Sequence, residues 1–142
     1  MHAALELAAE AGRNGEVPVG AVIMRGTDMI ASAANAMRAH RDPTAHAEIL
    51  AIRAAATALG SERLVGCDLW VTLEPCAMCA GAIANARIDR LYYAASDPKG
   101  GGVEQGARVF SHDSCHHKPE VYAGINESQA AEQLRDFFAT LR

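Results

Sequence analysis

Cys76 and Cys79 stand directly behind Pro75 and shortly after an apolar run, and this arrangement constrains the fold of the chain more than any other feature. Residues 68–73 predict a buried strand, and the proline predicts a helix that opens there and extends to about residue 86. Two residues three apart at a helix start share one face, and helix N-termini stabilise thiolates. The sequence therefore predicts a strand-to-helix junction that directs two thiolates to one point.

Three kinds of site use a C-x-x-C pair: a thiol redox couple, half of a four-cysteine structural zinc site, and half of a mixed zinc site. A four-cysteine site is disfavoured because the other two cysteines, Cys67 and Cys115, are isolated and form no second pair. A redox couple is disfavoured because Pro75 precedes the pair and Glu74 replaces the aromatic residue usual in such loops. A mixed zinc site requires a further ligand from elsewhere in the chain.

His46 and Glu48 lie at the start of a second predicted helix, residues 45–59, which residues 42–44 introduce with proline and capping residues. Side chains in a first helical turn lean back toward the N-terminus, so both can reach an object beyond the helix end. Taken singly, the histidine would be interpreted as a core residue and the glutamate as a solvated one. Beside the cysteine pair, we interpret them as a metal ligand and a proton carrier.

One imidazole and two thiolates, from His46, Cys76 and Cys79, neutralise the double charge of Zn²⁺ and leave a fourth position for water, as in catalytic zinc sites. Such an ion lowers the pKa of its bound water to about 7. The carboxylate of Glu48 would then act as general acid and base between this water and a leaving group. The sequence therefore predicts one catalytic zinc ion.

The rest of the chain predicts an α/β protein in which a mixed sheet has helices on both faces. Helices are predicted at residues 2–13 and 128–141, a β-hairpin at residues 17–24 and 29–34, and further strands at residues 88–94 and near Val121. Ligand sites in such sheets form where strand ends pass into helix starts. Both chemical motifs lie at junctions of that kind.

Length and composition predict a single domain, residues 1–142, with no apolar stretch long enough to span a membrane. The N-terminus lacks the basic start of a signal peptide, and four cysteines then indicate a reducing compartment, so we expect a cytoplasmic protein. The formal net charge is −4. Nucleic-acid binders are usually basic, so this charge counts against such a partner while leaving room for a local basic groove.

The chain resembles the bacterial tRNA adenosine deaminase family over nearly its whole length. The H-x-E…P-C-x-x-C signature is common to zinc nucleobase deaminases and indicates the chemistry only. Longer matching stretches indicate the subfamily, and they comprise residues 16–22, 42–49, 71–82, 86–88 and 136–138. The resemblance implies a cytidine-deaminase-like three-layer α/β/α sandwich with a mixed five-stranded sheet, a homodimer, and one Zn²⁺ per subunit.

The same resemblance implies a hydrolase that converts adenosine to inosine at the wobble position of a tRNA anticodon stem-loop. The metal ligands would be His46, Cys76 and Cys79, with Glu48 as catalytic acid and base. It further implies four substrate contacts: the Asn35 side chain, the backbone N–H of Ala47, and Asp97 and Lys99 in the loop touching nucleotides that flank the target. The segment 97–104 departs from the commonest version of that loop, which bears on tRNA affinity more than on catalysis.

The same residues are compatible with other hypotheses. The acidic net charge favours a deaminase of a free base or nucleoside, of the cytosine or guanine type. A zinc-stabilised binding module is a third hypothesis, although a structural site has no need of Glu48. Asn35 is equally well interpreted as a turn residue that ends a strand. The sequence Cys115-His116-His117 suggests a second metal cluster, but adjacent residues rarely converge on one ion, and we expect a variable loop.

Overall fold

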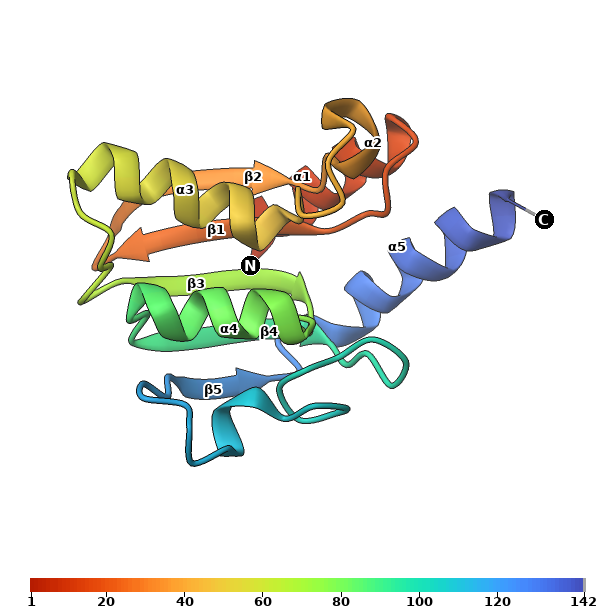
Figure 1. Cartoon of the computed structure of the whole chain (residues 1–142). Helices are drawn as coiled ribbons and strands as arrows, with labels where there is room; N and C mark the ends of the chain where they lie inside the picture. Colours follow the sequence, from red (N-terminus) through yellow and green to blue (C-terminus); the bar gives the residue numbers. More distant parts are fainter. Residues whose placement is uncertain (142) are drawn as a thin grey trace.

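The computed structural model describes residues 1–141 and is built on one five-stranded mixed sheet in the order β2-β1-β3-β4-β5 (Figure 1). The strands are β1 (Gly20–Arg25), β2 (Asp28–Ala34), β3 (Asp68–Leu73), β4 (Arg90–Ala95) and β5 (Glu120–Ala123). The β1–β2 and β1–β3 pairs are antiparallel, whereas β3–β4 and β4–β5 are parallel. The parallel strands therefore end at a common edge, where the chain turns from β3 toward a helix.

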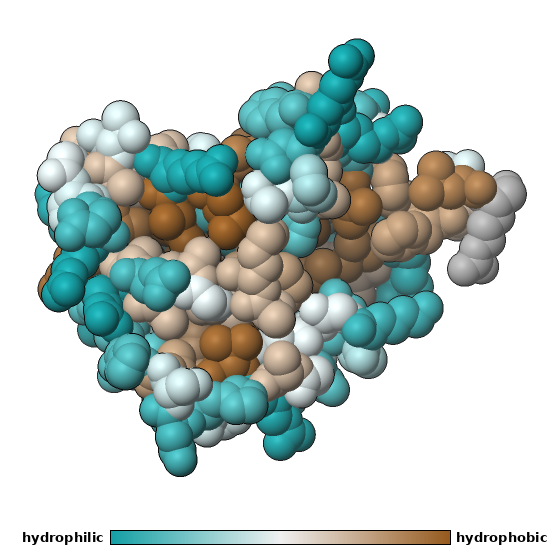
Figure 2. Space-filling model, in the orientation of Figure 1, coloured by the Kyte–Doolittle hydropathy of each residue, from teal (hydrophilic) through white to brown (hydrophobic). Residues whose placement is uncertain are grey.

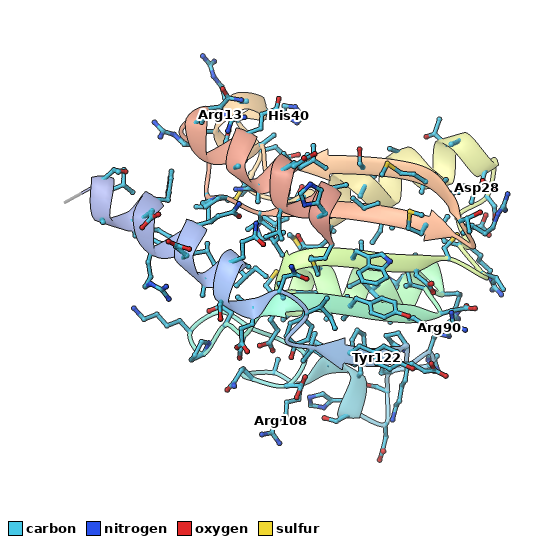
Figure 3. The ribbon with its side chains drawn as sticks, turned by 180° about the vertical axis from the view of Figure 1, so that it is seen from behind. Arg13, Asp28, His40, Arg90, Arg108 and Tyr122 are labelled. Atoms are coloured by element: carbon cyan, nitrogen blue, oxygen red, sulfur yellow. The ribbon has the colours of Figure 1, made fainter. Side chains whose placement is uncertain are left out.

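Helices cover both faces of this sheet, which confirms the predicted three-layer arrangement. The helices are α1 (His2–Arg13), α2 (Met37–His40), α3 (Ala47–Leu59), α4 (Ala77–Ala86) and α5 (Glu127–Thr140), with a short 3₁₀ turn at Val109–Ser111. In Figure 1, α3 and α4 lie side by side in front of the sheet. Figure 3 shows the reverse side, where α1 and α5 pack on the sheet. Arg90 of β4 and Tyr122 of β5 lie on a part of the sheet that these two helices do not cover.

Strand alternation divides the apolar residues between two layers. Leu69 and Leu91 point from the sheet toward α3 and α4 and belong to the larger core cluster, with Ile83 of α4. Ala94 points to the other face and packs with Leu5 of α1 and Ala130 of α5. Since consecutive strand residues face opposite sides, one sheet supplies both cores.

Gly20 lets α1 rest directly on β1. A Cβ atom at this position would lie 2.1 Å from the carbonyl oxygen of Ala4 and 2.9 Å from the backbone nitrogen of Ala8. No larger residue fits without moving the helix. This contact holds α1 close to β1. Strand β1 continues into β2, and Asn35 follows the end of β2.

The structure confirms most predicted elements and corrects two local expectations. Asp42 and Thr44 do not cap α3, because Asp42 Oδ1 accepts hydrogen bonds from the Thr44 N–H (2.8 Å) and hydroxyl (2.7 Å), and the N-cap is His46. Residues 37–40, to which the sequence patterns assigned no helix, form α2. No helix among residues 1–141 is long and apolar enough to cross a membrane.

Candidate metal centre and substrate pocket

The metal-ligating side chains come from two helix starts that face one another. His46 is the N-cap of α3, with φ −71° and ψ 152°, and Cys76 is the N-cap of α4, with φ −71° and ψ 175°. An N-cap residue ordinarily folds its side chain back to bond the helix amides. Neither residue makes such a bond. Both side chains therefore project beyond the helix ends into a shared space.

The three ligand atoms have the spacing of a tetrahedral zinc site. His46 Nδ1 lies 3.6 Å from Cys76 Sγ and 3.4 Å from Cys79 Sγ, and all three atoms lie within 4.8 Å of one another. Tetrahedral Zn²⁺ with its usual bond lengths to sulfur and nitrogen would separate these atoms by roughly 3.6 Å. His46, Cys76 and Cys79 are thus positioned to hold one metal ion.

The protonation states within this cluster suit a metal ligand set. Hydrogen bonds from Cys79 and His46 lower the pKa of Cys76 to about 4, against the effect of burial, so that this sulfur is a thiolate at neutral pH. The same bond to Cys76, together with burial, raises the pKa of Cys79. The bond to Cys76 also raises the pKa of His46. An incoming cation would displace the remaining protons from the cluster.

Glu48 is a buried carboxyl beside the ligand cluster. Its side chain is only 4% exposed, and it lines the same cavity as His46 and Cys76. Burial raises its pKa above the usual range, because water no longer solvates the charged form. A carboxyl with a raised pKa both accepts and returns protons near neutrality, as a general acid and base must.

A cavity of about 270 Å³ opens over this cluster. Of the residues predicted to contact substrate, Asn35, Ala47 and Asp97 line it, whereas Lys99 is exposed outside it. A larger groove of about 570 Å³ lies between α1 and β2, where Glu6 and Glu10 line it and none of the metal-ligating residues does. The smaller cavity is therefore the one with chemical groups at its floor.

Asn35 is held in the cavity wall with half of its amide unused. Its Nδ2 donates to the carbonyl oxygen of Val17 at 3.3 Å, and the residue is 7% exposed. Its Oδ1 is buried and has no hydrogen-bond partner among residues 1–141. Leaving a buried acceptor unpaired costs about 1–3 kcal/mol, which a bound ligand would recover. This geometry favours a substrate-binding residue over a turn residue.

Sequence reasoning gave no role to two buried carboxylates, Glu16 and Glu74. Glu16 accepts hydrogen bonds from the backbone N–H groups of Arg38 (3.1 Å) and Ala39 (2.8 Å), and so holds α2, whose Met37 lines the cavity. Glu74 accepts hydrogen bonds from the backbone of the loop on the opposite rim. The available signal was an acidic residue one or two positions before a proline and next to an apolar residue, in Glu16-Val17-Pro18 and Leu73-Glu74-Pro75. An unpaired charge buried there would be costly.

The segment Cys115-His116-His117 does not gather ligands around one point. Cys115 Sγ lies 3.1 Å from the carbonyl oxygen of His117, and the His117 ring bonds the carbonyl oxygen of Ile88 at 2.6 Å. Within residues 1–141, the group of histidine, cysteine and acidic side chains that converges as a metal site is the one formed by His46, Cys76 and Cys79. The segment lies in the irregular stretch between the 3₁₀ turn and β5.

Comparison with known proteins places this geometry in a family. The sequence model described as the cytidine and deoxycytidylate deaminase zinc-binding region matches residues 1–95. The tRNA-specific adenosine deaminase of Agrobacterium fabrum is 57% identical over 142 residues, which cover all of this chain and 93% of that protein. The chain belongs to the family of tRNA-specific adenosine deaminases.

Solved structures agree with this family membership. One, from a study of A-to-I editing by tRNA:A34 deaminases at the wobble position of transfer RNA, matches with a TM-score of 0.93 and 57% identity, covering 94% of this chain and 97% of the other. A guanine deaminase from Nitrosomonas europaea matches with a TM-score of 0.83 and 24% identity, covering 97% and 82% of the two chains. The second likeness concerns the fold alone.

Proposed function

We propose that this protein hydrolyses adenosine to inosine at the wobble position of a tRNA anticodon. The observation that carries the proposal is the pairing of a His46-Cys76-Cys79 ligand cluster with a buried acid, Glu48, in one cavity of the appropriate family. Extruding a base costs a few kcal/mol in a duplex and less from a loop that is already single-stranded. An anticodon loop is therefore a substrate that this small cavity can take without an extensive basic surface.

The residues of the chain divide the chemistry among them. When bound, zinc would supply a Lewis acid that brings the pKa of a water in the cavity to about 7. Glu48 would take one proton of that water and pass it to N1 of adenine as the oxygen bonds to C6, and would then carry the remaining hydroxyl proton to the exocyclic amine. The amine would leave as ammonia when its bond to C6 breaks, and the oxygen would become the carbonyl of inosine. The orphaned Asn35 Oδ1 and the backbone N–H of Ala47, at the first helical position of α3, orient the ring.

Residues at the rim of the cavity would contact the nucleotides that flank the target adenosine. Asp97 lines the opening, and Lys99 follows it on the exposed part of the same loop. A lysine there supplies a local positive charge to a phosphate, although the whole chain carries a formal net charge of −4. The proposed function needs only such local charge.

The alternative is a deaminase of a free base or nucleoside, which the net charge favours. To separate the two, the zinc-loaded protein is incubated with an anticodon stem-loop bearing adenosine at the wobble position, and in parallel with free adenosine, guanine and cytosine. We expect inosine from the stem-loop and no product from the free compounds. Turnover of a free base without turnover of the stem-loop would reject the proposed function in favour of the alternative.

We further propose a homodimer that forms through the face bearing α3 and α4. Figure 2 shows small and apolar residues across this face, bordered by hydrophilic ones. Gly81 of α4 has open space beyond it, and Met78 is 38% exposed. Small residues on a helix allow a second helix to approach closely. Such an apolar face on a soluble chain is typical of an oligomer interface.

Residues 1–142 are proposed to form a single deaminase domain that acts in the cytoplasm. A single sheet receives all five strands of the described residues, which supports one domain. The four cysteines are free thiols, and two of them belong to the metal cluster, which supports a reducing compartment. A tRNA substrate would be met there as well.

A further inference from the structure

Glu74 lies between the metal cluster and the loop that follows β4. The residue is 2% exposed and stands two positions before Cys76 in the turn from β3 to α4. Burial of an isolated carboxylate is unfavourable, so its partners must compensate. The backbone N–H groups of Asp97, Val103, Glu104 and Gln105 all donate hydrogen bonds to it. The side chain is thus a buried acceptor surrounded by N–H donors.

Both carboxylate oxygens of Glu74 accept hydrogen bonds from one loop, residues 96–105. Oε1 accepts from the Ser96 hydroxyl (3.3 Å) and the Asp97 N–H (3.1 Å). Oε2 accepts from the N–H groups of Val103 (3.2 Å), Glu104 (2.9 Å) and Gln105 (3.0 Å). Hydrogen bonds to a charged acceptor are the stronger kind. One side chain therefore fixes both ends of this loop.

The glycines of the loop allow it to pack onto the turn that carries the metal ligands. A Cβ atom at Gly101 would lie 2.6 Å from Glu74 Oε2, and a Cβ atom at Gly102 would lie 2.5 Å from the backbone nitrogen of Ala77. The Gly102 N–H also donates to the carbonyl oxygen of Pro75 at 2.8 Å. The two glycines thus let this segment pack closely on the turn formed by residues 75–77.

A second buried group holds the same loop. The hydroxyl of Tyr93, a residue only 2% exposed, donates a hydrogen bond to the carboxylate of Glu104. Asp97, at the start of the loop, caps its own turn by accepting from the N–H groups of Lys99 (3.1 Å) and Gly100 (3.0 Å). The anchored loop consequently places Asp97 and Gly100 at the rim of the cavity.

We propose that Glu74 is a positioning residue for substrate recognition: by gripping both ends of the 96–105 loop, it sets the distance between the flanking-nucleotide contacts and the metal-bearing turn. The inference rests on the proposed function, because flanking nucleotides matter only for a polynucleotide substrate. Glu74 neither lies among the ligand atoms nor moves a proton in the reaction. Its loss should weaken the use of flanking nucleotides while leaving the metal ligands in place.

Glu74→Gln tests this role, since the amide keeps one acceptor oxygen and replaces the other by an NH₂ group, so that it can serve only one of the two sets of N–H donors. Hydrogen exchange should show that either the amide of Asp97 or the amides of residues 103–105 lose protection, while zinc content stays at one per chain. On the stem-loop, kcat/KM should fall about tenfold, chiefly through KM. On a stem-loop with abasic sites flanking the target adenosine, wild type and variant should differ by less than about twofold.

Matched variants separate positioning from general destabilisation. Asp89→Asn makes the same chemical change where a carboxylate accepts the Gly66 N–H at 3.1 Å, outside the cavity, and should alter neither substrate. Tyr93→Phe removes the second anchor of the loop. It should lower kcat/KM on the intact stem-loop by a smaller factor, with little change on the abasic stem-loop. This variant provides the test if Glu74→Gln folds poorly. Equal losses of kcat/KM on both stem-loops, or unchanged amide protection in Glu74→Gln, would overturn the proposal. A wild-type protein inactive on the intact stem-loop would reject the proposed function instead, with the exchange data still deciding whether Glu74 anchors the loop.

Discussion

Single residues carry the chemistry because their environments differ sharply. Cys76 is a thiolate with a pKa of about 4, held by hydrogen bonds from its neighbours, whereas burial raises the pKa of Glu48. The first group suits a permanent bond to a cation, and the second suits repeated exchange of a proton. The two roles follow from surroundings built by two helix starts.

Replacement of Glu48 by Gln separates metal binding from catalysis. The variant should retain one zinc ion per chain, because the ligand atoms remain, and should lose about 10²- to 10⁴-fold in kcat, the usual contribution of a general acid and base. Metal analysis and inosine formation on the stem-loop measure the two effects. Cys76→Ala should lose both. Full activity in Glu48→Gln would reject the proton-transfer role.

Zinc affinity should depend on pH, because the raised pKa of Cys79 keeps a proton on its sulfur that the metal must displace. Above about pH 5 the Cys76 thiolate is already formed, since its pKa is about 4. Affinity should therefore fall by at least about tenfold per unit as pH decreases from 8 to 6, because on release Cys79 takes up one proton and His46, whose pKa is also raised, takes up part of a second. Competition with a chromophoric chelator measures this slope. The Cys115→Ser variant should keep it, and a pH-independent affinity would contradict the proposed ligand set.

At the scale of elements, helix starts were easier to predict than their caps. The sequence indicated that α3 and α4 begin near the two motifs, and the structure agrees. It did not indicate that His46 and Cys76 are themselves the N-caps, because capping preferences describe residues that bond the helix and not residues committed to a metal. The short α2 was missed since its stability comes from Glu16, twenty-odd residues upstream, and not from its own residues.

The features of the site that the sequence did not predict depend on contacts between residues far apart in the chain. The spacing of H-x-E and C-x-x-C indicated the ligand cluster, because each pair lies within one helical turn. Nothing local relates Glu74 to residues 103–105, which fold back onto it only in three dimensions. The unpaired Asn35 Oδ1 likewise emerges only when the packing around it is known. The residues that form the metal cluster could be predicted from local sequence, whereas the long-range contacts that position the cavity walls could not.

The packing of α1 on β1 gives a prediction about stability. Gly20→Ala should lower the free energy of unfolding by about 1–3 kcal/mol, because the new Cβ atom would clash with the backbone of Ala4 and Ala8. Denaturant unfolding measures the change. Gly12→Ala is the control, since its Cβ atom would meet Pro18 at an ordinary 3.5 Å. It should be neutral or stabilising by up to about 1 kcal/mol, as expected for alanine in a helix. Equal stability of Gly20→Ala and wild type would contradict this packing.

At the scale of the whole molecule, the sheet order brings two distant parts of the chain to one opening. The β1–β2 hairpin leads into Asn35 and α2, and the parallel β3–β4 pair leads into α4 and the 96–105 loop. The cavity lies where these parts meet. The apolar face (Figure 2) lies over α3 and α4, the two helices whose N-terminal residues line this cavity. Association through that face would therefore place a second copy near the opening.

Disruption of the apolar face should dissociate the proposed dimer. Gly81→Arg places a long charged side chain where the surface of α4 is open, so light scattering at micromolar concentration should give the mass of one chain. Met29→Arg is the matched control, because this 53% exposed side chain lines the groove against α1, behind the sheet. It should keep the dimer. A wild-type protein of monomer mass would contradict the dimer itself.

The central physical claim is that two helix starts supply one nitrogen and two sulfurs to a single zinc ion with a position left open. X-ray absorption at the zinc edge of the metal-loaded protein tests it most directly. We predict two sulfur ligands at about 2.3 Å, one nitrogen at about 2.0–2.1 Å and one further light atom. A shell of four sulfurs, or one without sulfur, would contradict the account.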